Sequence, residues 1–149
     1  MPILTCDENH VWRADGIIVP GVNQILNDMG CSDFSRIPKP IMERSQKFGS
    51  AVHRATELDD LNDLDLDSLD PAIFPYLQAW RKFKAENNVE IIAIEKSIYH
   101  PVYRYAGRLD RLLLMNRKIL TLTDIKSGTS MTPATELQTG AYAEAEKYE

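Results

Sequence analysis

The stretch that decides the fold is Gly107–Lys126, which reads GRLDRLLLMNRKILTLTDIK. It contains two apolar runs, 109–115 and 119–125, with a polar triplet at 116–118 between them. Runs of this length, rich in leucine and β-branched residues and separated by a short polar turn, indicate two strands of a β-hairpin.

The register of this hairpin follows from the turn. If the loop is 116–118, Met115 faces Ile119, and counting outward places Asp110 opposite Asp124. Side chains alternate along a strand, so Lys126 points to the same side as Asp124. A slip of one residue would put the two aspartates on opposite faces. The leucines expected on the same face, and expected to be core, are Leu112, Leu114, Leu120 and Leu122.

Two opposed carboxylates need something to neutralise them. Residues facing each other across an antiparallel pair lie about 4.5–5.5 Å apart, and like charges there repel. Mg²⁺ removes the repulsion, since it takes carboxylate oxygens, waters and substrate phosphates as ligands. A neighbouring lysine can then orient a water or stabilise charge on a phosphate. The alternative is that both aspartates are solvated strand-end residues and that Lys126 pairs with one of them.

Four short motifs, in this order, resemble the PD-(D/E)XK nuclease superfamily in its RecB-like and phage-exonuclease branch. GSAVH at 49–53 resembles the G-x-x-x-H of the first core helix. GRLD at 107–110 resembles the G-x-x-D, and DIK at 124–126 resembles the D/E-x-K of the catalytic hairpin. QTGAY at 138–142 resembles the Q-x-x-x-Y of the following helix.

This resemblance implies an α+β fold with a central mixed sheet flanked by helices. Residues 1–149 are then a single nuclease-like domain, with a hairpin-and-helix extension at 1–38 and the core at 39–149. The superfamily core closes with a strand after its second helix, and no such strand is expected before Glu149. The last core strand is therefore expected to be missing, supplied by a partner, or replaced by an N-terminal strand.

The resemblance also assigns roles to individual residues. The alternatives to these roles are a helix-surface histidine, a glutamate paired with a basic neighbour, a helix-surface glutamine, a half-buried tyrosine and an ordinary surface arginine. The residues assigned to catalysis are Asp110, Asp124, Lys126 and Glu95; those assigned to the metal are His53, Asp110, Asp124 and the carbonyl of Ile125; those assigned to DNA are Gln138, Tyr142 and Arg108.

Hydrophobic periodicity and turn residues predict the other elements. Asp15-Gly16 centres a hairpin over 10–19, a strand covers 89–99, and the acidic run 59–70 and the segment 127–131 are loops. Helices are expected at 22–29, from Pro40, from Pro71, and from Pro133 with Thr132 as cap. The apolar stripes of the last three helices are Ile41, Phe48, Val52 and Ala55; Ile73, Phe74, Leu77, Trp80 and Phe83; and Leu137, Ala141 and Ala145.

Composition bounds the class of protein. The chain has 44% hydrophobic and 26% charged residues, which is ordinary for a globular domain. No apolar run approaches the ~20 residues of a membrane span, and no secretory signal precedes the hairpin. Cys6 and Cys31 lack metal-ligand spacing and are expected to be reduced, which indicates a cytoplasmic protein. The net charge of −5 argues against DNA binding by bulk charge, although a nuclease can confine its basic groups to one groove.

The sequence thus predicts a Mg²⁺- or Mn²⁺-dependent deoxyribonuclease, an exonuclease of phage or bacterial origin acting in DNA replication, recombination or repair. Its expected partners are DNA and either a second copy or a recombination protein, with no membrane. One alternative is a non-catalytic nuclease-fold module that binds DNA or a recombination partner. Another is an unrelated α+β protein whose motif matches are accidental.

Overall fold

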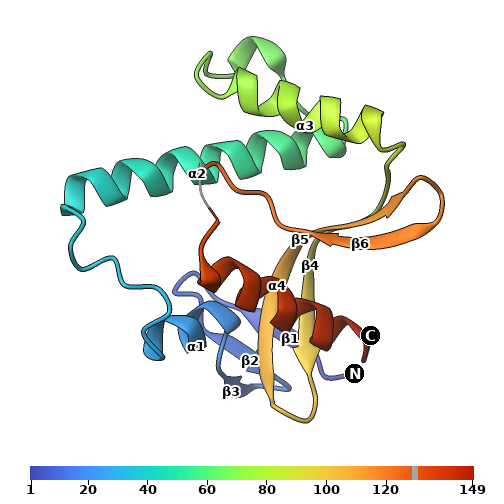
Figure 1. Ribbon diagram of the computed structural model, residues 1–149. Helices are drawn as coiled ribbons and strands as arrows, with labels where there is room; N and C mark the ends of the chain where they lie inside the picture. The colour runs from blue at the N-terminus through green and yellow to red at the C-terminus, as the bar shows by residue number, and fades with distance from the viewer. Residues whose placement is uncertain (129–130) are drawn as a thin grey trace.

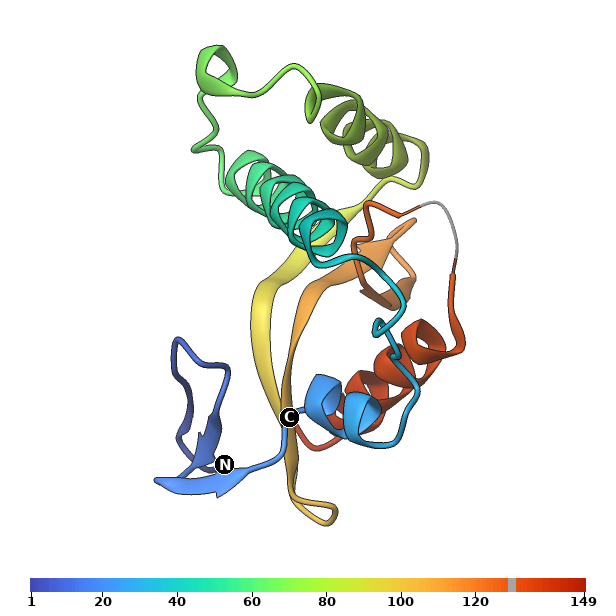
Figure 2. The same cartoon turned by 90° about the vertical axis from the view of Figure 1, so that its left-hand side faces the viewer.

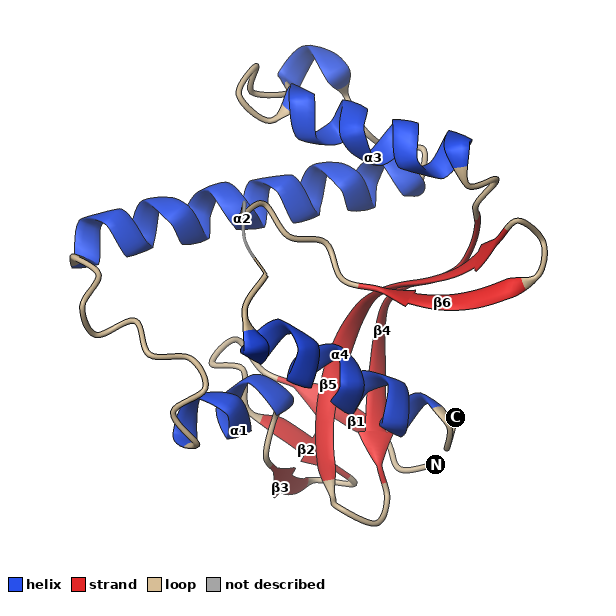
Figure 3. Ribbon diagram, viewed as in Figure 1, coloured by secondary structure: helices blue, strands red, loops and turns tan. Residues whose placement is uncertain are grey.

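The structure is a computed structural model that describes residues 1–128 and 131–149. Within them the chain is α+β, with four α-helices and two separate three-stranded antiparallel sheets (Figures 1 and 3). None of the described helices is both long and apolar enough to cross a membrane. The elements are β1 (Leu4–Cys6), β2 (Trp12–Ala14), β3 (Ile17–Val19), α1 (Val22–Asp28), α2 (Lys39–Asp60), the short 3-10 turn η1 (Leu66–Ser68), α3 (Phe74–Glu86), β4 (Glu90–His100), β5 (Tyr105–Met115), β6 (Ile119–Thr123) and α4 (Pro133–Glu146).

The predicted register of the β5–β6 hairpin is confirmed. Met115 pairs with Ile119 and Arg111 pairs with Thr123, as counting from the 116–118 turn requires. Asp110 and Asp124 are the next residues along the chain beyond that last pair. The predicted leucine face is only partly core. Leu112 is buried, whereas Leu120 is 60% exposed, because β6 is the edge strand and its first residues extend beyond the helices (Figure 1).

The expectation of a mixed central sheet is wrong for the described residues. The central sheet has the order β4-β5-β6 and is antiparallel throughout. The physical reason is that short turns join its consecutive strands, and a short turn can connect only antiparallel neighbours. Parallel pairing is limited to an isolated bridge between Gly21 and Ala106. Of the loop predicted at 127–131, residues 129 and 130 lie outside the described part of the chain.

The N-terminal hairpin forms as predicted and gains a third strand that the sequence analysis missed. Asp15 and Gly16 both adopt positive φ, 49° and 79°, as a tight two-residue hairpin turn requires. Strand β1 then pairs with β2 in the order β1-β2-β3. It escaped prediction because three residues, LTC, carry too little alternation to indicate a strand.

The long β4–β5 pair lies between two layers at its lower end, with α1 and α4 on one face and the N-terminal sheet on the other (Figure 2). Alternation along the strands supplies both layers: Ile98 and Tyr105 face the helices, and their neighbours Tyr99 and Ala106 face the small sheet. The helix-side core consists of Val22, Ile98, Tyr105, Leu109, Leu112, Tyr142 and Ala145.

Helices α2 and α3 pack together over the upper end of the sheet (Figure 1). Val52 and Ala55 of α2 are buried against Ile73, as the predicted stripes require. Ile41 was predicted to be core and is 56% exposed, because the first half of α2 projects beyond the sheet (Figure 1). Two further stripe residues are also exposed, Phe74 (39%) and Leu137 (52%).

Helices α3 and α4 differ in how closely their starts follow the prediction. Helix α3 begins at Phe74 and not at Pro71, because the Asp70 carboxylate accepts a hydrogen bond from the Ala72 N–H (2.8 Å) and closes a turn first. Helix α4 begins at Pro133 as predicted, with Thr132 at the cap position but no capping hydrogen bond from its side chain.

The acidic run was predicted to be a solvated loop, and this is wrong for its first two residues. Asp59 and Asp60 form the last turn of α2, and the side chain of Asp60 is fully buried. Asp60 Oδ2 lies 2.7 Å from Arg111 Nε, and its Oδ1 lies 2.6 Å from Lys84 Nζ. The Trp80 indole N–H donates to the same carboxylate at 3.0 Å. One buried carboxylate therefore ties α2, α3 and β5 together.

We expect Asp60→Ala to lower the free energy of unfolding by about 3 kcal/mol, because it leaves the buried Arg111 guanidinium without its main counter-charge. Urea denaturation of both proteins measures the change. Asp63→Ala is the control, since Asp63 is exposed and forms no ion pair among the described residues; it should shift stability by no more than about 0.5 kcal/mol. Equal effects of the two substitutions would contradict the structural role of Asp60.

We expect Gly107→Ala to destabilise the protein by about 1–3 kcal/mol through overpacking. An added Cβ would lie 2.5 Å from Cε1 of Tyr142, whose ring is buried and whose hydroxyl is held by a hydrogen bond from Gln138. Gly140→Ala on α4 is the matched control, since nothing lies within 4 Å of its added Cβ. That change should instead stabilise by about 0.5–1 kcal/mol in a helix interior, again measured by urea denaturation.

Candidate metal centre

Three ligand-bearing side chains from three elements converge beneath α2. His53 of α2, Glu95 of β4 and Asp110 of β5 each offer one atom, and these atoms all lie within 4.8 Å of one another. The sequence linked α2 to the hairpin only through the family motif. In the structure, His53 of α2 lies beside the carboxylate of Asp110 on the hairpin. A nitrogen and two carboxylate oxygens at this spacing suit a divalent cation.

Asp110 is the centre of the group. Its Oδ2 lies 3.6 Å from His53 Nδ1, and it accepts a hydrogen bond from the Ile125 N–H at 2.6 Å. The Asp110 side chain is only 10% exposed, whereas that of His53 is 33% exposed. The backbone beyond β6 therefore fixes the orientation of Asp110, and His53 forms the more open side of the site.

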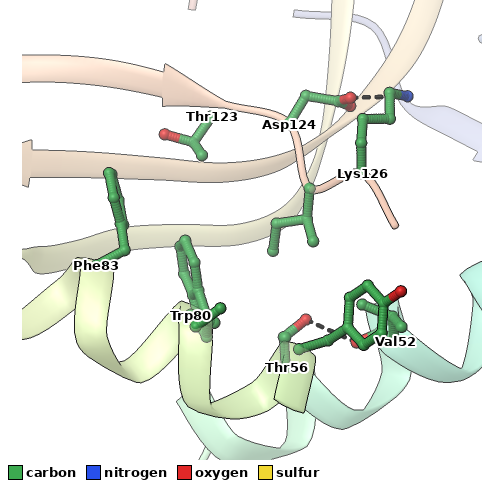
Figure 4. Close-up of a pocket in the computed structure, with 10 residues that line it drawn as sticks. Val52, Thr56, Trp80, Phe83, Thr123, Asp124 and Lys126 are labelled. Atoms are coloured by element: carbon green, nitrogen blue, oxygen red, sulfur yellow. Dashed lines mark hydrogen bonds and ion pairs between the residues drawn. The ribbon is translucent and has the colours of Figure 1, made fainter. Parts of the chain in front are cut away.

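Asp124 and Lys126 lie at the edge of this group, above a small apolar cavity of about 270 Å³ (Figure 4). Lys126 Nζ is 2.7 Å from Asp124 Oδ2 but does not meet hydrogen-bond geometry, so this buried oxygen accepts no hydrogen bond within the described residues. The Asp124 side chain is 7% exposed. Trp80 and Phe83 line the cavity below it (Figure 4).

A buried glutamine holds the lysine from the other side. Lys126 Nζ donates to Gln138 Oε1 at 3.1 Å. The amide nitrogen of Gln138 in turn donates to Asn23 Oδ1 at 2.8 Å and to the Tyr142 hydroxyl at 3.1 Å. Every polar atom of Gln138 is therefore occupied, which fixes the direction in which its carbonyl oxygen faces the ammonium.

Glu95 is held in place by an unusual backbone and a buried partner. Its φ is +49°, inside a strand, and it stands between residues paired with Arg111 and Leu109, hence opposite Asp110. Such a conformation costs a non-glycine residue on the order of 1 kcal/mol, and such residues cluster at functional sites. Glu95 Oε1 lies 3.2 Å from Arg111 Nη1. Glu95 therefore both pairs with a basic residue on the next strand and lies beside the other candidate metal ligands.

Burial raises the pKa of Asp110 to about 6, and the Asp124 carboxylate beside it acts in the same direction. His53 and the Ile125 N–H oppose this increase without cancelling it. Asp124 has the Lys126 ammonium at 2.7 Å, whereas the only cation-forming side chain that pairs with Asp110 among the described residues is His53. Together with the hydrogen-bond-free oxygen of Asp124, this is the electrostatic condition that a bound divalent cation would satisfy.

The structure brings most of the predicted site residues together. His53, Glu95 and Asp110 form the group of three, and Asp124 and Lys126 border it. Ile125 meets Asp110 through its N–H, so the role of its carbonyl as a ligand stays a prediction. Gln138 and Tyr142 are buried behind Lys126. Arg108 lies elsewhere, 5.7 Å from the Trp12 ring.

Two residues of the site escaped the sequence analysis. Arg111, fully buried, positions Glu95, and a charged residue inside the run RLLLM was the available signal. Asn23, which orients Gln138 from 115 residues away, gave no signal, because a polar residue on a short helix normally faces solvent.

Comparison of the chain with known protein families, with curated proteins and with solved structures gives no match. The geometry of these residues and the order of the motifs that carry them are therefore the basis for a proposed function.

We expect Asp110→Asn to stabilise the metal-free protein at pH 7.5, measured by thermal and urea unfolding in EDTA. The folded-state pKa of about 6 exceeds the ordinary value of 3.8 for an aspartate, so folding disfavours the ionised form. Stability of the parent protein should fall as pH rises from about 4 to 6, and the variant should escape a loss on the order of 2 kcal/mol.

The advantage of this variant should disappear near pH 4, where Asp110 is protonated in both states of the parent protein. Asp63→Asn serves as the control because its side chain is exposed, and it should show no such pH-dependent gain. If the variant is less stable than the parent at pH 7.5 and shows the same pH profile, folding does not disfavour the ionised form of Asp110.

Proposed function

We propose that the protein is a Mg²⁺- or Mn²⁺-dependent deoxyribonuclease with a PD-(D/E)XK-like core. The observation that carries the proposal is the meeting of His53, Glu95 and Asp110 within 4.8 Å beside a buried aspartate–lysine pair. These side chains come from α2, β4, β5 and the segment directly after β6.

Asp110, Glu95 and His53 would hold the ion, with Asp124 as the neighbouring carboxylate. A bound Mg²⁺ or Mn²⁺ supplies Lewis-acid activation of a phosphate and of a water. The mixed nitrogen and oxygen set accommodates Mn²⁺ as well as Mg²⁺, because imidazole is a better ligand for transition metals than for Mg²⁺.

Lys126 is the group that we assign to the attacking water and to the charge that develops on the phosphate. Its side chain is 45% exposed, so the ammonium reaches the mouth of the site. One of its three N–H bonds goes to Gln138 and its charge is balanced by Asp124 at 2.7 Å, which leaves donors for a water or a phosphate oxygen. Held from two sides, the ammonium needs little reorganisation during reaction.

Gln138 and Tyr142 support this role from behind. They are only 9% and 3% exposed, so they order the lysine through the hydrogen bonds described above. The direct DNA contact that the family resemblance implies for them stays a prediction.

The rival function is a non-catalytic nuclease-fold module that binds DNA or a protein partner. The outer edge of β6 favours it, since no described strand pairs with that edge and an open edge invites association. It predicts DNA binding or complex formation without metal-stimulated cleavage.

The deciding experiment is an assay on labelled linear duplex and single-stranded DNA, with Mg²⁺, Mn²⁺ or EDTA. We expect cleavage with either metal and none in EDTA. Asp124→Asn and Lys126→Ala should each lower the rate by about 100-fold or more, the usual cost of removing a charge-stabilising group. Calorimetry should show Mn²⁺ binding that Asp110→Asn weakens by about tenfold or more.

Lys118→Ala is the matched control for the lysine, because Lys118 is exposed in the β5–β6 turn at the opposite end of the hairpin. Its cleavage rate should equal that of the parent protein. Cleavage that both site variants retain would refute the assignment, and Mn²⁺ binding without any cleavage would favour the binding module.

A further inference from the structure

A second concave region lies next to the candidate metal centre. It is a groove of about 860 Å³ between the β1–β2 loop, α1 and β5, reached from α2 by a single residue, Gln46. Its floor is built from Trp12, Val22 and Tyr142, all buried. The polar side chains that line it are Asn9, His10, Asn23, Gln24, Asn27, Gln46 and Arg108.

The charge of the groove differs from that of the chain. The protein carries 22 acidic residues and a net charge of −5, yet no acidic residue lines the groove. Its one permanent cation, Arg108, is exposed and forms no ion pair within the described residues. The guanidinium lies over the Trp12 ring at 5.7 Å, which holds it in position without neutralising it. A single oriented cation in an acid-free groove suits a phosphate group.

Apart from Arg108 and His10, the polar side chains named above are carboxamides. An amide side chain offers both a donor and an acceptor, which is the combination that the edges of nucleobases require. Lysine is absent from the lining, so binding here would depend on oriented hydrogen bonds more than on bulk charge. This composition matches a nucleotide better than a peptide or a simple anion.

Two hydrogen bonds in series connect the groove to Lys126. Asn23 lines the groove and accepts a hydrogen bond from Gln138, which itself accepts one from Lys126. Asn23 uses its side-chain oxygen for this bond, so its N–H donors remain for a ligand. Gln46 lies seven residues before His53 on α2, two helical turns along the same face. Two separate routes thus lead from the groove to the metal centre.

We propose that this groove binds a single-stranded segment of DNA, one or two unpaired nucleotides adjacent to the scissile phosphate. Arg108 contacts a phosphate of this segment, and the amides of α1 contact its bases. The proposal rests on the proposed nuclease function and extends it to a substrate class, namely DNA with an unpaired strand at the site of cleavage.

The size of the groove favours an unpaired strand over a duplex. Pockets for small organic ligands measure about 300–1,000 Å³, and the volume of about 860 Å³ falls in that range. A duplex is far wider than such a pocket and could only lie across its rim. The floor is closely packed at Gly21, where an added Cβ would lie 2.8 Å from Cδ1 of Trp12.

The two cysteines of the chain provide the test without any mutation. Cys6 lines the groove and Cys31 does not, and both are free and half-buried. The protein in EDTA is alkylated with iodoacetamide, with or without a saturating single-stranded dodecathymidylate, and each site is quantified by mass spectrometry. We expect the oligonucleotide to slow alkylation of Cys6 by about fivefold or more while Cys31 is unchanged, because thiol reactivity follows access.

A substitution separates phosphate contact from indirect effects. Arg108→Ala should weaken binding of a fluorescent dodecathymidylate, measured by anisotropy, and should reduce the slope of log affinity against log salt by about 0.7, the value for one phosphate contact on a single strand. It should also abolish protection of Cys6 at the original oligonucleotide concentration. Lys118→Ala, the cation in the distant turn, should leave affinity and slope unchanged.

The outcomes distinguish this proposal from the proposed function. If metal-dependent cleavage occurs and the oligonucleotide binds without protecting Cys6, the groove is not the binding site and the nuclease assignment stands. If Cys6 is protected but no metal supports cleavage, the groove stands and the nuclease assignment falls. The same alkylation is run with a blunt-ended duplex of equal length, and equal protection of Cys6 by that duplex overturns the single-strand assignment. Failure of every oligonucleotide to bind overturns both proposals.

Discussion

The structure depends on a buried ion pair between Asp60 and Arg111, both without exposed side-chain surface. Asp60 ends α2, receives Lys84 and Trp80 from α3, and meets Arg111 on the central strand β5. Few apolar contacts join the two helices to the sheet, so this carboxylate is the main polar link between the layers. Burying these charges costs free energy. In many proteins, replacing such a buried cluster with apolar side chains leaves the fold equally or more stable. What the pair adds here is a defined position for α2, and therefore for His53.

The same pair also reaches the candidate site. Arg111 touches Asp60 on one side and Glu95 on the other, so the guanidinium that fixes the helices also fixes a carboxylate of the metal group. Around Asp110 the chain accepts unfavourable features together: a raised pKa, an aspartate oxygen without a hydrogen bond, and a strand residue with positive φ. One buried oxygen without a hydrogen bond lies elsewhere, Glu146 Oε2, but the three features named here meet around Asp110, and backbone strain of this kind clusters at functional sites.

Whether the sequence could predict a contact in this site depends on how far apart the two residues lie along the chain. The turn at 116–118 sets the register of the hairpin as far as the Arg111–Thr123 pair by counting alone, and Asp110 and Asp124 are the next residues on the two sides. The position of Asp60 could not be found in this way, since its partner Arg111 is 51 residues further on and its acidic neighbours suggest a solvated loop. Exposed residues such as Ile41 and Leu120 were expected in the core, because periodicity identifies an apolar face without showing where its cover ends.

The left-handed backbone at Glu95 has a consequence for the way this chain can vary. Successive side chains of β4 contact different layers here. Glu95 contacts Arg111, whereas the next side chain, Lys96, lies 2.7 Å from Glu146 on α4. A homologue shorter by one residue at this point would bring an ammonium against the buried guanidinium. Insertions and deletions in this strand should therefore be confined to its bulge near Ile92, where the pairing with β5 already shifts by one residue.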